Sequence, residues 1–224
     1  MRIFTNHEDL AAAAAGAIAE ALARPRPKTL IVTGGTSPGA VYDRLSAMDL
    51  DWASTTVTLT DDRWVASDSP DSNERLVRDR LLTGRAAGAR FLPLKGAEDT
   101  PEADALAVEP SLAALPTADA VLLGMGEDGH IASLFPTDPD LAARLDPDGA
   151  RLCVGVAMAG LAPFIPRITL TVAALLRARL LVLLITGLAK LAIIERVASD
   201  PDYAPPVAAI LRQTRAPVSV LWAP

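Results

Sequence analysis

Residues 118–136, ADAVLLGMGEDGHIASLFP, carry the pattern that decides the fold. The apolar run 120–123 lies between Asp119 and Gly124, which is typical of a short strand buried on both faces. The segment 124–130, GMGEDGH, follows at once and predicts a turn at the end of that strand. In doubly wound α/β folds, ligands bind where the parallel strands end. We therefore expect this turn to carry the chemistry of the protein.

His130 is the residue of this turn best suited to proton transfer. It is one of two histidines in the chain, and imidazole exchanges protons near neutral pH. Asp128 precedes it by two residues and is placed to fix the orientation or the tautomer of its ring. The three glycines of the turn permit positive φ and a close approach of the backbone to a ligand. A purely structural histidine, hydrogen-bonded to backbone, is the alternative.

Composition limits the classes of protein to which the chain can belong. It has 224 residues, half of them hydrophobic, and neither a repeat nor a linker divides it, so we expect a single domain over residues 1–224. The formal net charge of −6 argues against a nucleic-acid partner, although a few local cations suffice to bind a phosphorylated metabolite. The chain therefore favours a small-molecule ligand.

Cysteine, histidine and hydropathy patterns bear on metals and on location. Cys153 is the single cysteine, which excludes an internal disulfide, and its apolar surroundings predict a core residue. One cysteine and two distant histidines give no metal-site spacing. No signal peptide and no apolar run of about 20 residues is visible. These patterns predict a cytoplasmic protein without a membrane segment or a metal.

Strand and helix patterns alternate along the rest of the chain. Strands are expected at residues 3–4, 30–32, 55–60, 91–94, 120–123, 152–157, 167–171, 180–185 and 218–222. Helices are expected at residues 9–23, 41–48, 74–82, 172–178, 188–198 and 207–211, and within 95–114. Residues 137–150 predict a surface loop with one helical turn, and 161–166, with two prolines, an extended segment. The alternation indicates a doubly wound α/β fold: a mostly parallel sheet with helices on both faces.

Two further strand ends carry polar loops. TGGTSPG, residues 33–39, lies between a strand and a helix, so its backbone N–H groups and the Thr36 and Ser37 hydroxyls suit an anion. A plain turn is the alternative there. DDRW, residues 61–64, follows the strand at 55–60, and its alternative is a solvated loop.

Two other chemistries are less well supported. Residues 124–129 match G-x-G-x-x-G, but Pro136 leaves little room for the helix of a dinucleotide-binding motif, and the acids at 146 and 148 lie in a loop. Ser133 lies three residues after His130, yet no nucleophile elbow surrounds it. We expect Ser133 to be a helix or turn hydroxyl.

GEDGHIASLFP, residues 126–136, resembles the signature of the 6-phosphogluconolactonases. The related glucosamine-6-phosphate deaminases share the DGH core but continue toward Asn-Glu-Pro, so the ASLFP tail is the lactonase form. Asp62 stands where that family has glutamate. Four more segments match family elements in the same order: residues 33–38, 61–64 with 72–73 downstream, 167–169 and 187–190.

This resemblance implies a sugar-phosphate isomerase-like, Rossmann-type α/β fold and hydrolysis of 6-phospho-D-glucono-1,5-lactone to 6-phosphogluconate, in the pentose phosphate pathway. It implies no metal and no cofactor. His130 would be the general base, and Asp128 would orient it or stabilise its imidazolium form. Arg63 would lie near the lactone carbonyl or the phosphate and offset the developing oxyanion charge. The phosphate would be held by Gly34, Gly35, Thr36, Ser37, Arg167 and Lys190.

The alternatives left open are a glucosamine-6-phosphate deaminase-like enzyme and a non-catalytic sugar-phosphate sensor. A sensor of this type is usually fused to a DNA-binding segment, and none is visible in the sequence. We expect a monomer or a small homo-oligomer.

Overall fold

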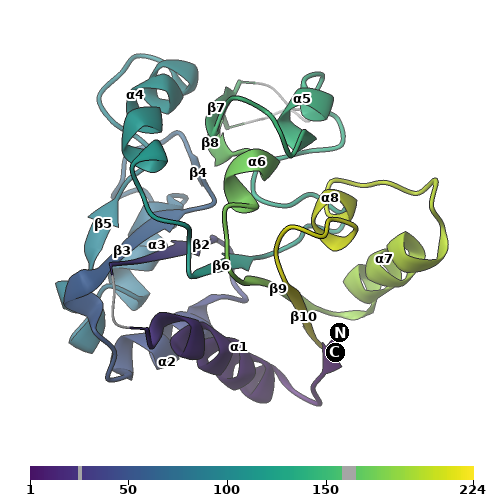
Figure 1. The fold of residues 1–224 in the computed structure, drawn as a ribbon, viewed down its shortest axis with the longest axis horizontal. Coiled ribbons are helices and arrows are strands. Elements are labelled where there is room, and N and C mark those ends of the chain that lie inside the picture. Colours follow the sequence, from purple (N-terminus) through teal and green to yellow (C-terminus); the bar gives the residue numbers. More distant parts are fainter. Residues whose placement is uncertain (25–26, 158–164) are drawn as a thin grey trace.

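The computed structural model describes residues 1–24, 27–157 and 165–224, which form one large sheet, one small sheet and the helices around them (Figure 1). The large sheet has seven strands, and neighbouring strands are parallel throughout. Their order is β1 (Arg2–Ile3), β10 (Val218–Ala223), β9 (Leu181–Thr186), β6 (Ala120–Leu123), β2 (Lys28–Val32), β3 (Thr55–Leu59) and β5 (Arg90–Leu92). The α/β fold with a mostly parallel sheet is thus confirmed.

Strand β6 lies at the centre of this sheet, between β9 and β2. All four of its residues are buried, as are all five of β2. Strands covered on both faces are typically near-continuous apolar runs, in contrast to the alternating pattern of strands with one exposed face. The uninterrupted AVLL run therefore identified the central strand.

Helices cover both faces of the large sheet. They are α1 (His7–Leu22), α2 (Gly39–Ala47), α3 (Asn73–Arg80), α4 (Pro101–Ala113), α5 (Leu141–Leu145), α6 (Val172–Leu175), α7 (Leu188–Ser199) and α8 (Ala208–Leu211), with 3₁₀ turns η1 (Trp52–Ser54) and η2 (Gly84–Gly88). In Figure 1, α1 and α2 lie below the sheet, whereas α6 and α8 lie above it. The long helix α1 begins where the Asn6 side chain accepts a hydrogen bond from the Asp9 N–H.

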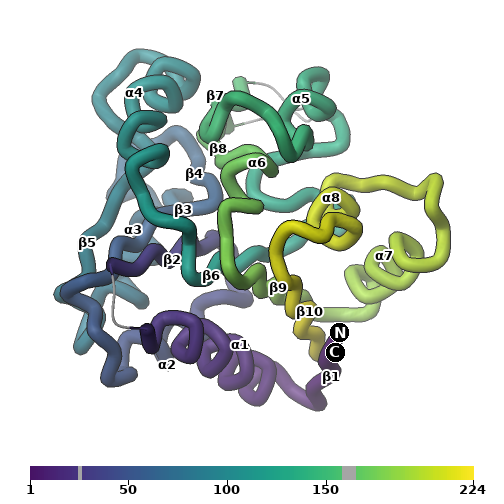
Figure 2. The backbone as a smooth tube through the Cα atoms, in the orientation of Figure 1, coloured from purple at the N-terminus to yellow at the C-terminus, as the bar shows by residue number. Residues whose placement is uncertain are grey.

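The two ends of the chain lie side by side (Figure 2). Strand β1 pairs with the last strand, β10, and the Phe4 N–H donates to the Trp222 carbonyl over 2.8 Å. The edge of the sheet is therefore built from both ends of the sequence.

A second, three-stranded sheet is antiparallel and was not predicted. It consists of β4 (Asp61–Arg63), β8 (Arg167–Leu170) and β7 (Cys153–Val156), with β8 in the middle. The strands expected at 152–157 and 167–171 are present, but they do not join the parallel sheet. Residues 157–166 alone connect them, and a parallel crossover needs a dozen residues or more.

The remaining expectations differ in small ways. The helix expected at 172–178 is shorter, because α6 ends in a cap at Leu176. The extended segment expected at 161–166 lies mostly outside the described residues. Cys153 is a core residue as predicted, and burial raises the pKa of its thiol. In the described parts of the chain, no helix combines the length and the apolar character needed to cross a membrane.

Candidate active site

A cleft of about 220 Å³ opens at the carboxyl ends of the parallel strands. It is lined by the loops after β2 and β6, by strands β4 and β8 of the small sheet and by the first turn of α7, with Asn73 of α3 and Leu184 of β9 beside them. Every residue predicted for the site lines it except Asp128: Gly34, Gly35, Thr36, Ser37, Arg63, His130, Arg167 and Lys190. Segments far apart in sequence therefore share one cavity.

Asp128 lies directly behind His130. Its Oδ1 is 2.6 Å from His130 Nδ1, and the same oxygen accepts the His130 backbone N–H over 3.0 Å. Partial burial works against ionisation of this carboxyl group, but the hydrogen bonds from His130 outweigh it and hold the pKa of Asp128 below its usual range. An ionised carboxylate only accepts hydrogen bonds, so Nδ1 carries the proton and Nε2 is the basic nitrogen of the neutral ring.

Glycine is required at two positions of this turn. A Cβ on Gly126 would lie 2.2 Å from two atoms of the His130 ring, so the ring packs directly on bare backbone. Gly129 has φ of +80°, a conformation that other residues adopt only with strain. The turn is closed by the Gly126 N–H, which donates to the His130 carbonyl over 2.9 Å. These glycines fix the ring relative to β6.

The Phe135 ring lies beside both His130 and Arg167. Its ring centroid lies 4.6 Å from that of His130, and the Arg167 guanidinium carbon lies 5.7 Å from the same centroid. Aromatic rings attract cations over their faces at this range. The phenylalanine of the ASLFP tail thus contacts two residues of the predicted site, a role that its position in the sequence did not indicate.

The loop after β2 has the shape of an anion site. Gly35 has φ of +94°, and a Cβ on Gly34 would collide with the Asn73 side chain, so both glycines are needed. The loop leads into the N-terminus of α2, and the first turn of a helix favours negative charge.

Cations from three elements face this loop. Arg63 and Arg167 are directly opposite each other in the small sheet, and like charges at such positions repel. Burial and the nearby Arg63 lower the pKa of Arg167. Lys190 lies in the first turn of α7, where a cation opposes the helix dipole. An anion in the cleft would offset the repulsion between the two arginines and would stabilise the charges of the partly buried Arg167 and of Lys190.

Asp61 is a lining residue that sequence reasoning missed. It is 5% exposed, and its carboxylate accepts hydrogen bonds from the Ser133 hydroxyl (2.6 Å) and the Thr60 hydroxyl (2.8 Å). A solvated loop at residues 61–64 is therefore wrong. Strand alternation was the available signal, because it places Asp61 and Arg63 on one face and Asp62 on the other.

Ser133 is not arranged as a nucleophile. It is fully buried, its hydroxyl donates to Asp61, and its backbone N–H donates to the Thr169 hydroxyl over 3.1 Å. These bonds attach the segment after His130 to strands β4 and β8. The expected role of a turn hydroxyl is the one observed.

Asp62, the departure from the lactonase pattern, does not line the cleft. Its side chain is fully buried and accepts hydrogen bonds from the Ser72 hydroxyl (3.0 Å) and the backbone N–H groups of Asn73 (2.6 Å) and Glu74 (3.2 Å) at the start of α3. The shorter carboxylate thus belongs to the scaffold behind the site.

A dinucleotide-binding motif is not formed. Residues 124–140, all of which the structure describes, contain turns and no helix after Gly129. That motif binds pyrophosphate at the N-terminus of the helix that follows it, so its essential element is missing here.

The fold and the site together define an α/β protein with a histidine–aspartate pair and a cationic cleft at the carboxyl edge of its sheet. The family model of glucosamine-6-phosphate isomerases/6-phosphogluconolactonase matches residues 5–222. The chain therefore belongs to that family.

Individual relatives agree. The chain is 45% identical to a 6-phosphogluconolactonase of Caulobacter vibrioides, over all of this chain and 97% of the relative, and 42% identical to one of Pseudomonas aeruginosa, over 96% and 89%. The crystal structure of a 6-phosphogluconolactonase from Shewanella baltica superimposes with a TM-score of 0.93 at 37% identity, covering all of this chain and 97% of the other.

Proposed function

We propose that this protein is a lactone hydrolase that converts 6-phospho-D-glucono-1,5-lactone and water to 6-phospho-D-gluconate, a step of the pentose phosphate pathway. The observation that carries the proposal is the meeting of His130, backed by Asp128, with the glycine loop, Arg63, Arg167 and Lys190 in one cleft. Relatives that share over 40% of their residues with this chain bear the matching name.

His130 acts as the general base. Nε2 takes a proton from water while the water oxygen attacks the lactone carbonyl carbon. Asp128 accepts the Nδ1 proton of the ring and stabilises the imidazolium that forms, because the two atoms are 2.6 Å apart and the carboxylate is ionised. The bond from the carbonyl carbon to the ring oxygen then breaks, and the imidazolium returns its proton to that oxygen.

Charge develops on the carbonyl oxygen as water adds, and Arg63 offsets it from the wall of the cleft. The phosphate is held by the backbone and hydroxyls of Gly34, Gly35, Thr36 and Ser37, and by Arg167 and Lys190. Arginine suits bidentate contact with phosphate oxygens and lysine a point-charge contact. The doubly charged phosphate relieves the repulsion between the opposed arginines.

Hydrolysis of the lactone, followed as acid release above the spontaneous rate, tests the proposal. Ammonia release from glucosamine 6-phosphate, with no acceleration of lactone hydrolysis, would establish the deaminase alternative. Binding of 6-phosphogluconate without any turnover would establish the sensor.

The proposal also covers the domain organisation, the oligomeric state and the location of the protein. The chain acts as a single catalytic domain over residues 1–224, as a monomer or small homo-oligomer, and in the cytoplasm. A small sugar-phosphate lactone is its partner, and neither a metal nor a cofactor takes part.

A further inference from the structure

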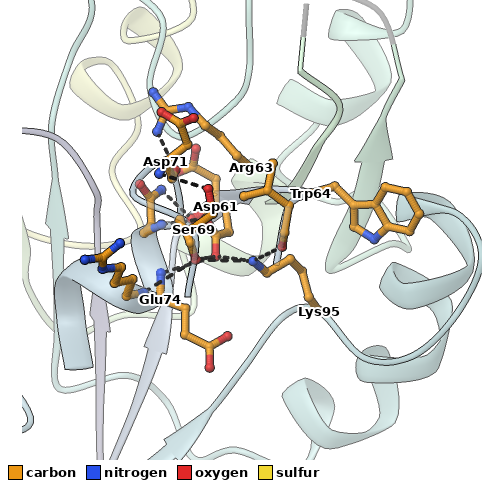
Figure 3. Close-up of polar contacts among 12 residues, drawn as sticks. Asp61, Arg63, Trp64, Ser69, Asp71, Glu74 and Lys95 are labelled. Atoms are coloured by element: carbon orange, nitrogen blue, oxygen red, sulfur yellow. Dashed lines mark hydrogen bonds and ion pairs between the residues drawn. The ribbon is translucent and has the colours of Figure 1, made fainter. Parts of the chain in front are cut away.

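The ammonium group of Lys95 (Figure 3) forms a buried ion pair with Asp62. The Lys95 Nζ and Asp62 Oδ2 atoms are 3.0 Å apart, and the two side chains are 8% and 0% exposed. Neither residue lines the cleft, and neither takes part in the reaction described above.

The Lys95 ammonium group reaches both ends of one loop. Besides Asp62 it donates to the Val65 carbonyl over 2.8 Å, just after β4, and to the Ser72 hydroxyl over 3.2 Å, just before α3. An ammonium group has three protons to donate, so all of them are used. A single side chain therefore closes the loop of residues 65–72.

Among residues 1–24, 27–157 and 165–224, this loop supplies the one hydrogen-bond acceptor of the Arg63 side chain. The Arg63 Nη1 donates to the Asp71 carbonyl over 3.0 Å, one residue before Ser72. Arg63 also follows Asp62 directly in β4. Lys95 thus holds the strand that carries Arg63 and the loop that receives its guanidinium group.

The same pair determines where Asn73 lies. The Asp62 carboxylate binds the Asn73 backbone N–H over 2.6 Å, and the Asn73 side chain donates to the Asp61 carbonyl over 2.8 Å. That side chain packs against bare Gly34 in the glycine loop. The contacts of the buried pair therefore reach two walls of the cleft.

Stability alone does not account for such a pair. Removing two charges from water is costly, and apolar replacements of buried pairs are often as stable or more stable. What a buried pair can supply is a single geometry. We propose that Lys95 is a positioning residue, which acts through the Asp62 carboxylate and the 65–72 loop to hold Arg63 in its catalytic place; this rests on the role given to Arg63 in the proposed function.

Lys28 provides a matched control elsewhere in the same chain. It is also a buried lysine, 2% exposed in its side chain, and also donates to a carboxylate, a carbonyl and a hydroxyl: Asp51 Oδ2 (3.0 Å), the Asp51 carbonyl (3.2 Å) and Ser54 (2.9 Å). It begins β2, at the opposite end of that strand from the glycine loop. Its loss removes the same kinds of contact without reaching the cleft.

The test compares Lys95→Met, Lys28→Met, Arg63→Ala and the Lys95→Met/Arg63→Ala double variant in full-length protein, each assayed below its own unfolding temperature. We expect Lys95→Met to lower kcat/KM for the lactone by about tenfold to a hundredfold, as misplacement of a catalytic group does. Lys28→Met should leave kcat/KM within about twofold of wild type, a change smaller than the loss of any catalytic contact. In the Arg63→Ala background, Lys95→Met should cause little further loss, because coupled residues are non-additive.

Two results would overturn the inference alone: Lys95→Met behaving like Lys28→Met while Arg63→Ala loses activity, or full additivity of the two changes. Wild-type activity in Arg63→Ala would instead overturn the role of Arg63, and this inference with it. If Lys95→Met does not fold because Asp62 is left unpaired, the charge-free Asp62→Asn/Lys95→Met variant takes its place, with the same expected loss and the same additivity criterion.

Discussion

The two edges of the parallel sheet differ in how their charged side chains are paired. At the amino edge, charges meet opposite charges: Lys28 binds Asp51 at 3.0 Å, and Arg179 lies 3.9 Å from the buried Asp119. At the carboxyl edge, the described lining residues comprise three cationic side chains and one carboxylate, Asp61. Charges are thus paired at the amino edge, whereas the carboxyl edge has an excess of positive charge, which suits an anionic substrate.

Gly126→Ala is the substitution expected to disturb the carboxyl edge most. The new Cβ would displace the His130 ring, which lies 2.2 Å from its position, and would also approach Asp128. We expect kcat to fall by about a hundredfold or more, because a displaced general base loses most of its contribution. Steady-state kinetics on the lactone measure this.

Gly16→Ala is the control for that change. Gly16 lies inside α1, and a Cβ there meets nothing within 4 Å. Activity should be unchanged, and the free energy of unfolding should rise by about 0.5–1 kcal/mol, as for any exposed helical glycine. Equal losses of activity in the two variants would show that the ring contact at Gly126 is unimportant.

Arg167→Met and Arg179→Met compare the two edges directly. We expect Arg167→Met to raise KM about tenfold to a hundredfold, because one charge-assisted contact contributes about 1.5–3 kcal/mol to binding. Arg179→Met removes a cation whose partner, Asp119, also accepts a hydrogen bond from the Thr29 N–H, and KM should not change. A fall in kcat at unchanged KM in Arg167→Met would contradict a phosphate-binding role.

The smallest expected effect is on stability and comes from Asp128. Its folded-state pKa is lowered by His130 despite partial burial, so its ionisation stabilises the folded state above the unfolded pKa of about 3.9. That contribution is lost as pH falls through the lower folded pKa. Wild type should therefore exceed Asp128→Asn in urea-unfolding free energy near pH 6, and the difference should shrink below about pH 4. A difference independent of pH would contradict the ionised pair.

Local patterns predicted the elements that depend on local physics. The apolar run of β6, the glycines that follow it and the alternation of strands and helices gave the parallel sheet and the position of His130. The small sheet was missed because its strands are short and its pairing joins residues 61–63 to 167–169, far apart in sequence. Asp61 was missed for the same reason, since its burial depends on Ser133 and on the strand opposite.

The site residues were named from the family resemblance rather than from local patterns. The sequence predicted which residues would meet, and all of them except Asp128, which lies behind His130, line the cleft. It did not indicate that Phe135 lies between His130 and Arg167, nor that Asp62 faces Lys95, because both contacts form only when loops from separate elements pack together. Which cation meets the phosphate stays a prediction.

The general-base role of His130 is tested most directly by the rate at which His130→Ala hydrolyses 6-phosphoglucono-1,5-lactone, with 6-phosphogluconate binding measured on the same sample. We expect kcat to fall by about 10²–10⁴-fold, toward the spontaneous rate, while product affinity is retained, because the residues proposed to hold the phosphate are unchanged. Turnover close to that of wild type would show that the imidazole does not activate water.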